Sequence, residues 1–156
     1  MKNQFKNKKV LITGHTGFKG SWLVAWLNIL GAEILALSKD VPTKPAHYDL
    51  IKNSLNNDLR LDITNYEKIS KTIVDYKPDF LFHLAAQPIV LTSYEDPFLT
   101  FQSNTVGTLN ILESLRKSNH NCIAVIITSD KCYENLDKKI KYKESDRVGG
   151  KDPYSA

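Results

Sequence analysis

Residues 10–23 of the chain read VLITGHTGFKGSWL, an apolar run followed by three glycines and the beginning of a second apolar pattern. The glycines, Gly14, Gly17 and Gly20, are spaced by threes. A turn this tight needs residues without Cβ, and it leaves backbone N–H groups free where a helix begins. A pyrophosphate would bind to such groups. The stretch therefore predicts a strand, a phosphate-binding turn and a helix, and hence a dinucleotide site.

Other interpretations of the glycine turn are possible. Its G-x-x-G-x-x-G spacing differs from the G-x-G-x-x-G of the two-domain dehydrogenases. A nucleotide-triphosphate loop would end in Gly-Lys-Ser/Thr, whereas Lys19 here precedes Gly20. Glycine-rich turns also join strands to helices where nothing binds, so the turn alone leaves a purely structural role open.

Composition limits the classes of function. The 156 residues are 42% hydrophobic and 24% charged, as expected for one soluble domain. No apolar run is long enough to span a membrane and no signal-peptide pattern occurs, so we expect a cytoplasmic protein with no membrane partner. Cys122 and Cys132 lack partners at metal-ligand spacing, which predicts reduced thiols and no metal.

The net charge of +4 does not predict nucleic-acid binding. The lysines are scattered among acidic residues, apart from a cluster at residues 138–143 that we interpret as a solvated loop. A mildly basic surface also suits an anionic small molecule such as a nucleotide sugar. We expect no nucleic-acid partner.

Strand-like and helix-like segments alternate along the chain. Strands are expected at residues 10–13, 33–37, 79–86 and 122–128, with the tail of a further short strand at 60–62, and helices at residues 18–30, 65–76 and 97–117. This order predicts an α/β fold, a Rossmann-like doubly wound parallel sheet that is incomplete at its C-terminal end. We expect Trp22 and Trp26 to pack in the core, and the polar stretch around Pro42 and Pro45 to be a functional or a mobile loop.

Four clusters of residues follow predicted strands, where an open parallel sheet binds its ligands. The Asp62 carboxylate can accept a hydrogen bond from an adenine amino group, although it could instead cap the next helix. The small residues Ala85 and Ala86 allow the backbone to approach a ribose. His83 lies in a buried apolar run, so we interpret it as a core residue. The predicted cofactor-binding residues are Gly14, Gly17, Phe18, Lys19, Gly20, Asp62, Ile63, Ala85 and Ala86.

Four segments resemble one known family. TGHTGFKG (13–20), HLAAQP (83–88), SNTVGT (103–108) and YSA (154–156) are similar to the extended short-chain dehydrogenase/reductases, also called the NAD-dependent epimerase/dehydratase family. More narrowly, GHTGFKGSWL, AAQP, SDKCYEN and GGKDPYSA resemble its CDP-glucose 4,6-dehydratase branch. The resemblance implies NAD as cofactor, a nucleotide-sugar substrate, and a homo-oligomer for the full-length protein.

The resemblance also implies a reaction and the residues that perform it. The sugar is oxidised at C4, water is lost across C5 and C6, and hydride returns to C6. By position, Tyr154 would take the C4 hydroxyl proton, Ser129 would hydrogen-bond that oxygen, and Asp130 would protonate the departing C6 hydroxyl. Lys131 would act as a base if it is neutral, or would stabilise enolate charge. Alternatively, Lys131 only pairs with Asp130 or Glu134.

A tyrosine with an ordinary pKa near 10 needs a nearby positive charge to act as a base. In this family that charge is a lysine four residues on, which here would be the second residue beyond Ala156. We therefore expect residues 1–156 to form an NAD-binding domain that is truncated within its catalytic motif, lacks the substrate-binding region and is inactive alone.

Two departures from the family pattern leave alternatives open. Leu91-Thr92 stands where an arginine is common, which puts a substrate or loop contact in doubt. Ser38-Lys39-Asp40 offers no acid at the usual ribose-binding position, so the preference for NAD over NADP rests on the resemblance. The alternatives are an epimerase or reductase of the same superfamily, and a non-catalytic nucleotide-binding module.

Overall fold

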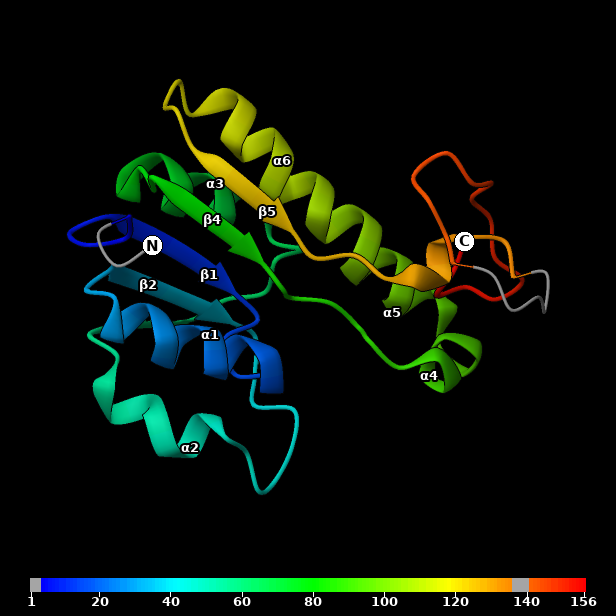
Figure 1. Cartoon of the computed structure of the whole chain (residues 1–156), viewed down its shortest axis with the longest axis horizontal. Coiled ribbons are helices and arrows are strands. Elements are labelled where there is room, and N and C mark those ends of the chain that lie inside the picture. Colours follow the sequence, from blue (N-terminus) through cyan, green and yellow to red (C-terminus); the bar gives the residue numbers. More distant parts are fainter. Residues whose placement is uncertain (1–3, 136–140) are drawn as a thin grey trace.

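The computed structural model describes residues 4–135 and 141–156, and it contains one parallel sheet of five strands in the order β3-β2-β1-β4-β5 (Figure 1). The strands are β1 (Lys9–Thr13), β2 (Glu33–Ser38), β3 (Asn57–Arg60), β4 (Phe80–His83) and β5 (Ile123–Ile126). This order confirms the predicted α/β, Rossmann-like fold. Residues 138–140 of the lysine cluster lie outside the described residues.

Helices cover both faces of the sheet (Figure 1). Alternate side chains of a strand point to opposite faces, so Val10 and Ile12 pack with α1 (Phe18–Ile29), whereas Leu11 belongs to the core beneath α3 (Tyr66–Tyr76) and α6 (Thr108–Lys117). The sheet is therefore buried on both faces at its centre, and its loops remain at the two ends of the strands.

The helix predicted over residues 97–117 is present with an internal change of pitch. It consists of α5 (Pro97–Phe101), a π-helical segment η2 (Gln102–Gly107) and α6. Asp96 caps its beginning by accepting a hydrogen bond from the Leu99 N–H. The sequence did not predict the π-helical segment or the short helix α4 (Val90–Glu95).

The polar stretch between β2 and β3 differs from the predicted loop. It contains helix α2 (Tyr48–Ile51) and the 3₁₀ turn η1 (Lys52–Ser54), and β3 ends at Arg60, the first residue of the predicted strand tail at 60–62. Tyr48 is only 7% exposed. The segment is thus anchored by a buried aromatic ring that its polar composition concealed.

The prediction that Trp22 and Trp26 pack in the core was wrong. Their exposed fractions are 55% and 56%. The buried stripe of α1 runs through Gly20, Val24 and Leu27, and the tryptophans lie on a neighbouring face of the helix.

β5 forms one edge of the sheet, and its side chains are poorly covered. Ile123 is 59% exposed and Val125 is 38% exposed. Within the part of the chain that the structure describes, β5 pairs only with β4. After β5 the chain forms the short 3₁₀ helix η3 (Asp130–Cys132) and an irregular segment. β5 is therefore an open and partly exposed edge of the sheet.

Candidate functional site

The glycine turn lies where the strand order changes direction. β1 neighbours both β2 and β4, and ligands of open parallel sheets bind outside the carboxyl ends of strands at such a point. The turn follows β1, and Leu84 to Ala86 follow β4. A backbone hydrogen bond from Leu84 N–H to Thr13 O, at 3.1 Å, joins these two ends, and one from Gly14 N–H to Leu37 O, at 2.8 Å, joins the turn to β2.

Gly14 is required by its conformation and by its neighbours. Its φ is 77°, in the left-handed region, and a Cβ there would lie 2.6 Å from Ala85 N. Beside it, Thr13 Oγ1 accepts a hydrogen bond from Ala85 N–H at 3.2 Å. The turn after β1 and the loop after β4 are therefore in direct backbone contact.

The other two glycines have different environments. A Cβ on Gly20 would lie 2.2 Å from Gly14 O, so the first turn of α1 packs directly on the glycine turn. A Cβ on Gly17 would meet only Gly14 O, at 3.4 Å, and Gly17 has an ordinary φ of −72°. Among the described residues, no side chain caps the beginning of α1. The helix N-terminus and the space over Gly17 are thus suited to an anion.

Asp62 does not cap a helix. Its Oδ1 accepts hydrogen bonds from Thr64 N–H and Oγ1–H, each at 2.9 Å, and its Oδ2 lies 3.1 Å from Lys39 Nζ. Burial raises the pKa of Asp62, but the hydrogen bonds from Thr64 and Lys39 outweigh burial and hold it below its ordinary value. Asn65 caps α3 instead, accepting from Lys68 N–H at 3.1 Å. The Asp62 carboxylate is therefore ionised and available as an acceptor.

Ile63 contributes to the core rather than to an open surface. Its side chain is buried against Gly107, where a Cβ would lie 2.5 Å from the Ile63 Cδ1 atom. Only the backbone of Ile63 remains for a ligand contact, and its carbonyl already accepts from Asn110 Nδ2 at 3.0 Å.

The loop that carries Ala85 and Ala86 is held by a side chain of the π-helical segment. Asn104 Oδ1 accepts from Gln87 N–H at 2.8 Å, and Asn104 Nδ2 donates to Gln87 O at 3.1 Å. A single amide thus satisfies both backbone groups of Gln87. These two hydrogen bonds indicate that Asn104 orders the loop after β4.

His83 is the core residue that the sequence predicted. Its Nδ1 lies 2.6 Å from Thr13 Oγ1, and its Nε2 lies 3.0 Å from Thr108 Oγ1. Burial lowers the pKa of His83 to about 4. The ring is therefore neutral at physiological pH and joins β4 to β1 and α6.

The residues after β5 form a compact turn. Ser129 Oγ accepts from Lys131 N–H at 3.2 Å and lies 3.4 Å from Asp130 Oδ1. Within residues 4–135 and 141–156, Lys131 forms no ion pair with Asp130 or Glu134, and Glu134 lies 3.5 Å from Arg147. The alternative in which Lys131 only pairs with a neighbouring carboxylate is therefore not supported.

Asp130 and Lys131 face the C-terminal segment across a cavity of about 500 Å³, which Asp152 and Ser155 also line. The two chain segments are joined by hydrogen bonds from Gly149 N–H to Cys132 O, at 2.8 Å, and from Glu134 N–H to Arg147 O, at 2.9 Å. The structure thus brings together two of the four predicted catalytic residues. Ser129 and Tyr154 do not line this cavity.

Tyr154 lies in a turn with the hydrogen bonds of a helix N-terminus. Asp152 Oδ1 accepts from Tyr154 N–H at 3.0 Å and from Ser155 N–H at 3.1 Å, and Asp152 O accepts from Ala156 N–H at 3.1 Å. Pro153 occupies the first position, where its missing N–H costs nothing. The turn also needs Gly150, because a Cβ there would lie 1.8 Å from Ser155 Cβ.

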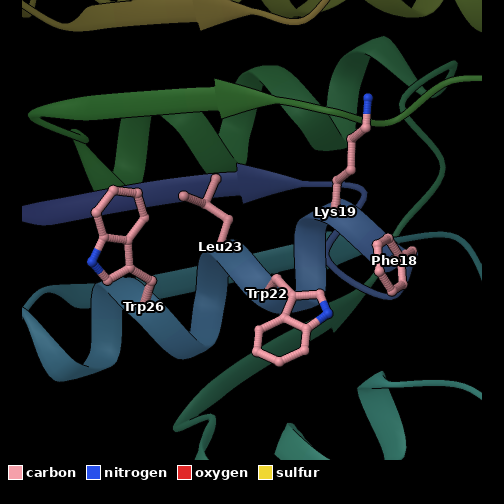
Figure 2. Close-up of a pocket in the computed structure, with 5 residues that line it drawn as sticks. All are labelled: Phe18, Lys19, Trp22, Leu23 and Trp26. Carbon is pink, nitrogen blue, oxygen red and sulfur yellow. The ribbon is translucent and has the colours of Figure 1, made fainter.

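An apolar hollow of about 490 Å³ lies on α1 beside the glycine turn, and Figure 2 shows its five lining residues, Phe18, Lys19, Trp22, Leu23 and Trp26. The two indole rings lie one helical turn apart, with Leu23 between them (Figure 2). The sequence missed this hollow, because helical spacing places two side chains on one face without saying whether that face is buried.

Two further residues, His15 and Asp58, lie beneath the turn and were not predicted from the sequence. His15 is fully buried inside the glycine turn, and its Nε2 lies 3.1 Å from Asp58 Oδ1 of β3. The sequence does show a histidine inside the glycine motif, but its partner Asp58 lies 43 residues away. Local pattern therefore could not pair them.

Other site classes find no support in residues 4–135 and 141–156. This part of the chain has no group of three or more His, Cys, Asp or Glu side chains placed to hold a metal ion. None of its helices has the length and apolar character needed to cross a membrane. Cys122 and Cys132 are both free thiols.

The strand order and the glycine turn at its switch point define the class of protein: a Rossmann-like domain of the extended short-chain dehydrogenase/reductase type. The family model described as GDP-mannose 4,6 dehydratase matches residues 11–156. The chain therefore belongs to this family of nucleotide-sugar dehydratases and epimerases.

Named relatives agree with this assignment. The chain is 43% identical over 155 residues to the CDP-glucose 4,6-dehydratase of Salmonella typhimurium, covering 99% of this chain and 43% of that protein. It is 36% identical to the CDP-paratose 2-epimerase of Salmonella typhi, covering 88% of this chain and 41% of that protein. The chain thus spans less than half the length of these relatives.

A solved structure agrees as well. The UDP-glucose 4-epimerase of Thermus thermophilus, in complex with NAD, superimposes with a TM-score of 0.79 and 28% identity. The alignment covers 94% of this chain and 46% of the epimerase.

Proposed function

We propose that this chain is the NAD-binding part of a nucleotide-sugar 4,6-dehydratase that acts on CDP-glucose. The observation that carries the proposal is the uncapped beginning of α1 at the switch point of the sheet, where a Cβ on Gly17 would meet only Gly14 O, at 3.4 Å. Gly14 and Gly20 are needed for contacts within the protein, whereas Gly17 has no comparable steric reason to be glycine. A pyrophosphate placed against Gly17 supplies that reason.

The residues around this turn fit NAD. The N–H groups at the start of α1 would hold the pyrophosphate, with Phe18 and Lys19 contributing through the backbone. The ionised Asp62 would accept from the adenine amino group. Ala85 and Ala86, which have small side chains and lie in backbone contact with the turn, would allow a ribose to approach.

Charges at the ends of β2 and β3 favour NAD over NADP. Lys39 Nζ lies 3.1 Å from Asp62 Oδ2, and Arg60 donates to Asp58 Oδ2 at 3.1 Å. A ribose 2′-phosphate needs a cation to receive it. Both of these cations are already paired with a carboxylate, so binding a 2′-phosphate would require breaking an existing pair.

The proposed reaction removes water with no net oxidation. When bound, NAD would supply the hydride acceptor for C4–H and the hydride donor for C6. Tyr154 would take the C4 hydroxyl proton while Ser129 hydrogen-bonds that oxygen. The C5 proton and the C6 hydroxyl leave as water, with Asp130 donating a proton to the hydroxyl and Lys131 removing the C5 proton or stabilising the enolate. To complete the reaction, one of the protons taken up by Tyr154 and Lys131 would return to C5 as C6 receives hydride.

We propose CDP-glucose as the substrate because the chain is 43% identical to a CDP-glucose 4,6-dehydratase. A second candidate is a nucleotide-sugar epimerase, favoured by the 36% identity to a CDP-paratose 2-epimerase. Dehydration needs an acid beside the Ser129 position, and Asp130 provides one. The pair Asp130-Lys131 therefore favours a dehydratase.

Two measurements on the purified chain test the proposal. Calorimetric titration should detect one NAD site, and incubation with NAD and CDP-glucose should yield no appreciable 4-keto-6-deoxy product by NMR. The second expectation follows because we place the sugar-binding residues in the part of the relatives that this chain does not match. Absence of NAD binding by folded protein would overturn the function, and product formation would overturn the division between cofactor and substrate parts.

A further inference from the structure

His15 occupies the centre of a buried network under the glycine turn. Its ring is 0% exposed, and its Nδ1 lies 2.9 Å from Ser38 Oγ. The same Ser38 oxygen accepts from Thr16 N–H at 3.3 Å, and Thr16 Oγ1 donates to Asp40 O at 2.6 Å. One hydroxyl at the end of β2 thus fixes both His15 and the residue that precedes Gly17.

The opposite edge of the ring faces a carboxylate. Nε2 lies 3.1 Å from Asp58 Oδ1, but the two atoms are not aligned for a hydrogen bond, and neither has another partner among the described residues. Burial lowers the pKa of His15, opposed by the Leu37 carbonyl and Asp58, so the ring is neutral at physiological pH. A carboxylate only accepts hydrogen bonds, so the Asp58 contact favours the tautomer with the ring proton on Nε2, in which Nδ1 accepts from the Ser38 hydroxyl.

Asp58 also contacts Tyr48 of α2. Its Oδ2 accepts from the Tyr48 hydroxyl and from Arg60 at 3.1 Å. Arg60 also donates to the Tyr48 oxygen at 2.7 Å, and its guanidinium lies 5.0 Å from the centre of the Tyr48 ring. The His15 and Tyr48 rings meet edge to face at 5.5 Å. His15, Asp58 and Tyr48 therefore form one continuous contact from the glycine turn to residues 41–56.

A second contact fixes the same segment to α1. His47 Nδ1 lies 2.8 Å from Ser21 Oγ, and the His47 ring stacks on Trp22 with centroids 4.2 Å apart. Residues 41–56 therefore hold the beginning of α1 from two sides: His47 on the helix itself, and Tyr48 through Asp58 and His15. Both contacts therefore end close to the uncapped beginning of the helix.

We propose that His15 is a positioning residue for the dinucleotide: through Asp58 and Tyr48 it orients the turn around Gly17 and links cofactor binding to the ordering of residues 41–56. This inference rests on the proposed binding of NAD. In the structure the His15–Asp58 contact is close but misaligned. NAD bound at Gly17 would align His15 Nε2 with Asp58 Oδ1. The stronger His15–Asp58 contact would in turn hold Tyr48 more firmly.

Two substitutions separate positioning from simple packing. His15→Gln places an amide donor near the Nε2 position and can still reach Asp58. His15→Asn places its amide near Nδ1, keeps the Ser38 contact and leaves Asp58 unmatched. Ser114→Ala is the matched control, because Ser114 is also fully buried but donates to Asn110 O within α6.

The experiment measures two properties of the 156-residue chain and its variants. Calorimetry gives the Kd for NAD, and hydrogen exchange of residues 46–56 reports the ordering of the segment with and without NAD. His15→Asn should weaken NAD binding about tenfold and His15→Gln by about threefold or less, because His15→Asn leaves Oδ1 of the partly buried Asp58 without a donor. NAD should slow exchange at residues 46–56 in the wild type and in His15→Gln, but not in His15→Asn.

Each outcome bears on one inference. If His15→Asn lowers thermal stability as Ser114→Ala does but leaves the NAD Kd unchanged, the positioning role is overturned. If wild-type protein binds no NAD, the proposed function fails. The link from His15 to Tyr48 is then tested by hydrogen exchange alone, which must be faster at residues 46–56 in His15→Asn than in the wild type. If His15→Asn does not fold, Tyr48→Phe replaces it and should weaken NAD binding about threefold, and an unchanged Kd overturns the inference.

Discussion

Gly14 and Gly20 lie so close together that a Cβ on Gly20 would stand 2.2 Å from the Gly14 carbonyl oxygen. This contact seats α1 directly on the end of β1. The fold therefore needs glycine at positions 14 and 20. Gly17 has no such close contact.

Alanine at the three glycines should therefore give different results. Gly14→Ala and Gly20→Ala should each lower the free energy of unfolding by more than about 2 kcal/mol, because the methyl groups meet backbone atoms at 2.6 Å and 2.2 Å. Gly17→Ala should stay within about 1 kcal/mol of the wild type while weakening NAD binding about tenfold. Urea denaturation and calorimetry measure the two effects, and an unchanged NAD Kd in Gly17→Ala would argue against a pyrophosphate at this position.

Stability should fall in mild acid because of His83. Burial lowers the pKa of His83 to about 4, whereas an unfolded histidine titrates near 6.5. The unfolded chain therefore binds a proton first, so the contribution of His83 is complete above pH 6.5 and is lost as the pH falls toward 4. The loss is on the order of 3 kcal/mol, and the buried His15 acts in the same direction.

The pH dependence has a direct control. His83→Gln keeps an amide near the Thr108 contact but does not titrate in this range. Urea denaturation at several pH values should show a clearly flatter profile for His83→Gln between pH 6.5 and pH 4. Identical profiles for the two proteins would mean that His83 is not the source.

Asn104 should govern the loop after β4. Asn104→Ala removes the partners of both backbone groups of Gln87, which should cost about 1–3 kcal/mol of stability. Asn104→Asp can still accept from Gln87 N–H but cannot donate to its carbonyl, so its free energy of unfolding should also be lower than that of the wild type. Hydrogen exchange at Gln87 should accelerate in Asn104→Ala, and unchanged exchange would show that the loop is held by other contacts.

The exposed position of Trp26 can be tested against its neighbour Leu27. Trp26→Gln should change the free energy of unfolding by about 0.5 kcal/mol or less, as is usual at a surface position. Leu27→Ala, at a residue only 1% exposed, should cost about 2–5 kcal/mol. A loss in Trp26→Gln comparable to that in Leu27→Ala would restore the core position first expected for this indole.

The sequence was sufficient for the sheet and for the glycine turn, because both have local signatures. The closely spaced Gly14, Gly17 and Gly20 mark one turn between a strand and a helix, and the apolar strands alternate with helices of recognisable period. The C-terminal ends of the strands then follow from the topology of a parallel sheet. The family resemblance added the candidate catalytic residues, which no local period could reveal.

The errors arose where tertiary contacts decide the structure. Residues 41–56 look like a polar loop, but Tyr48 is held by Asp58 and His47 by Ser21, which are separated from them along the chain. For Trp22 and Trp26, helical spacing gave their mutual distance but not which face of α1 meets the sheet. The π-helical segment at residues 102–107 has the same apolar spacing as an ordinary helix, so the hydrogen bonds of Asn104 could not be foreseen.

The central claim is that the beginning of α1 holds the pyrophosphate of NAD. It is tested most directly by an NMR titration of isotope-labelled protein with NAD, following backbone amides. The account predicts saturable shifts that are largest at Gly17, Phe18, Lys19 and Gly20, with smaller shifts at Asp62 and Ala85. Saturable binding whose largest shifts lie elsewhere, or no shift in a folded protein, would contradict it.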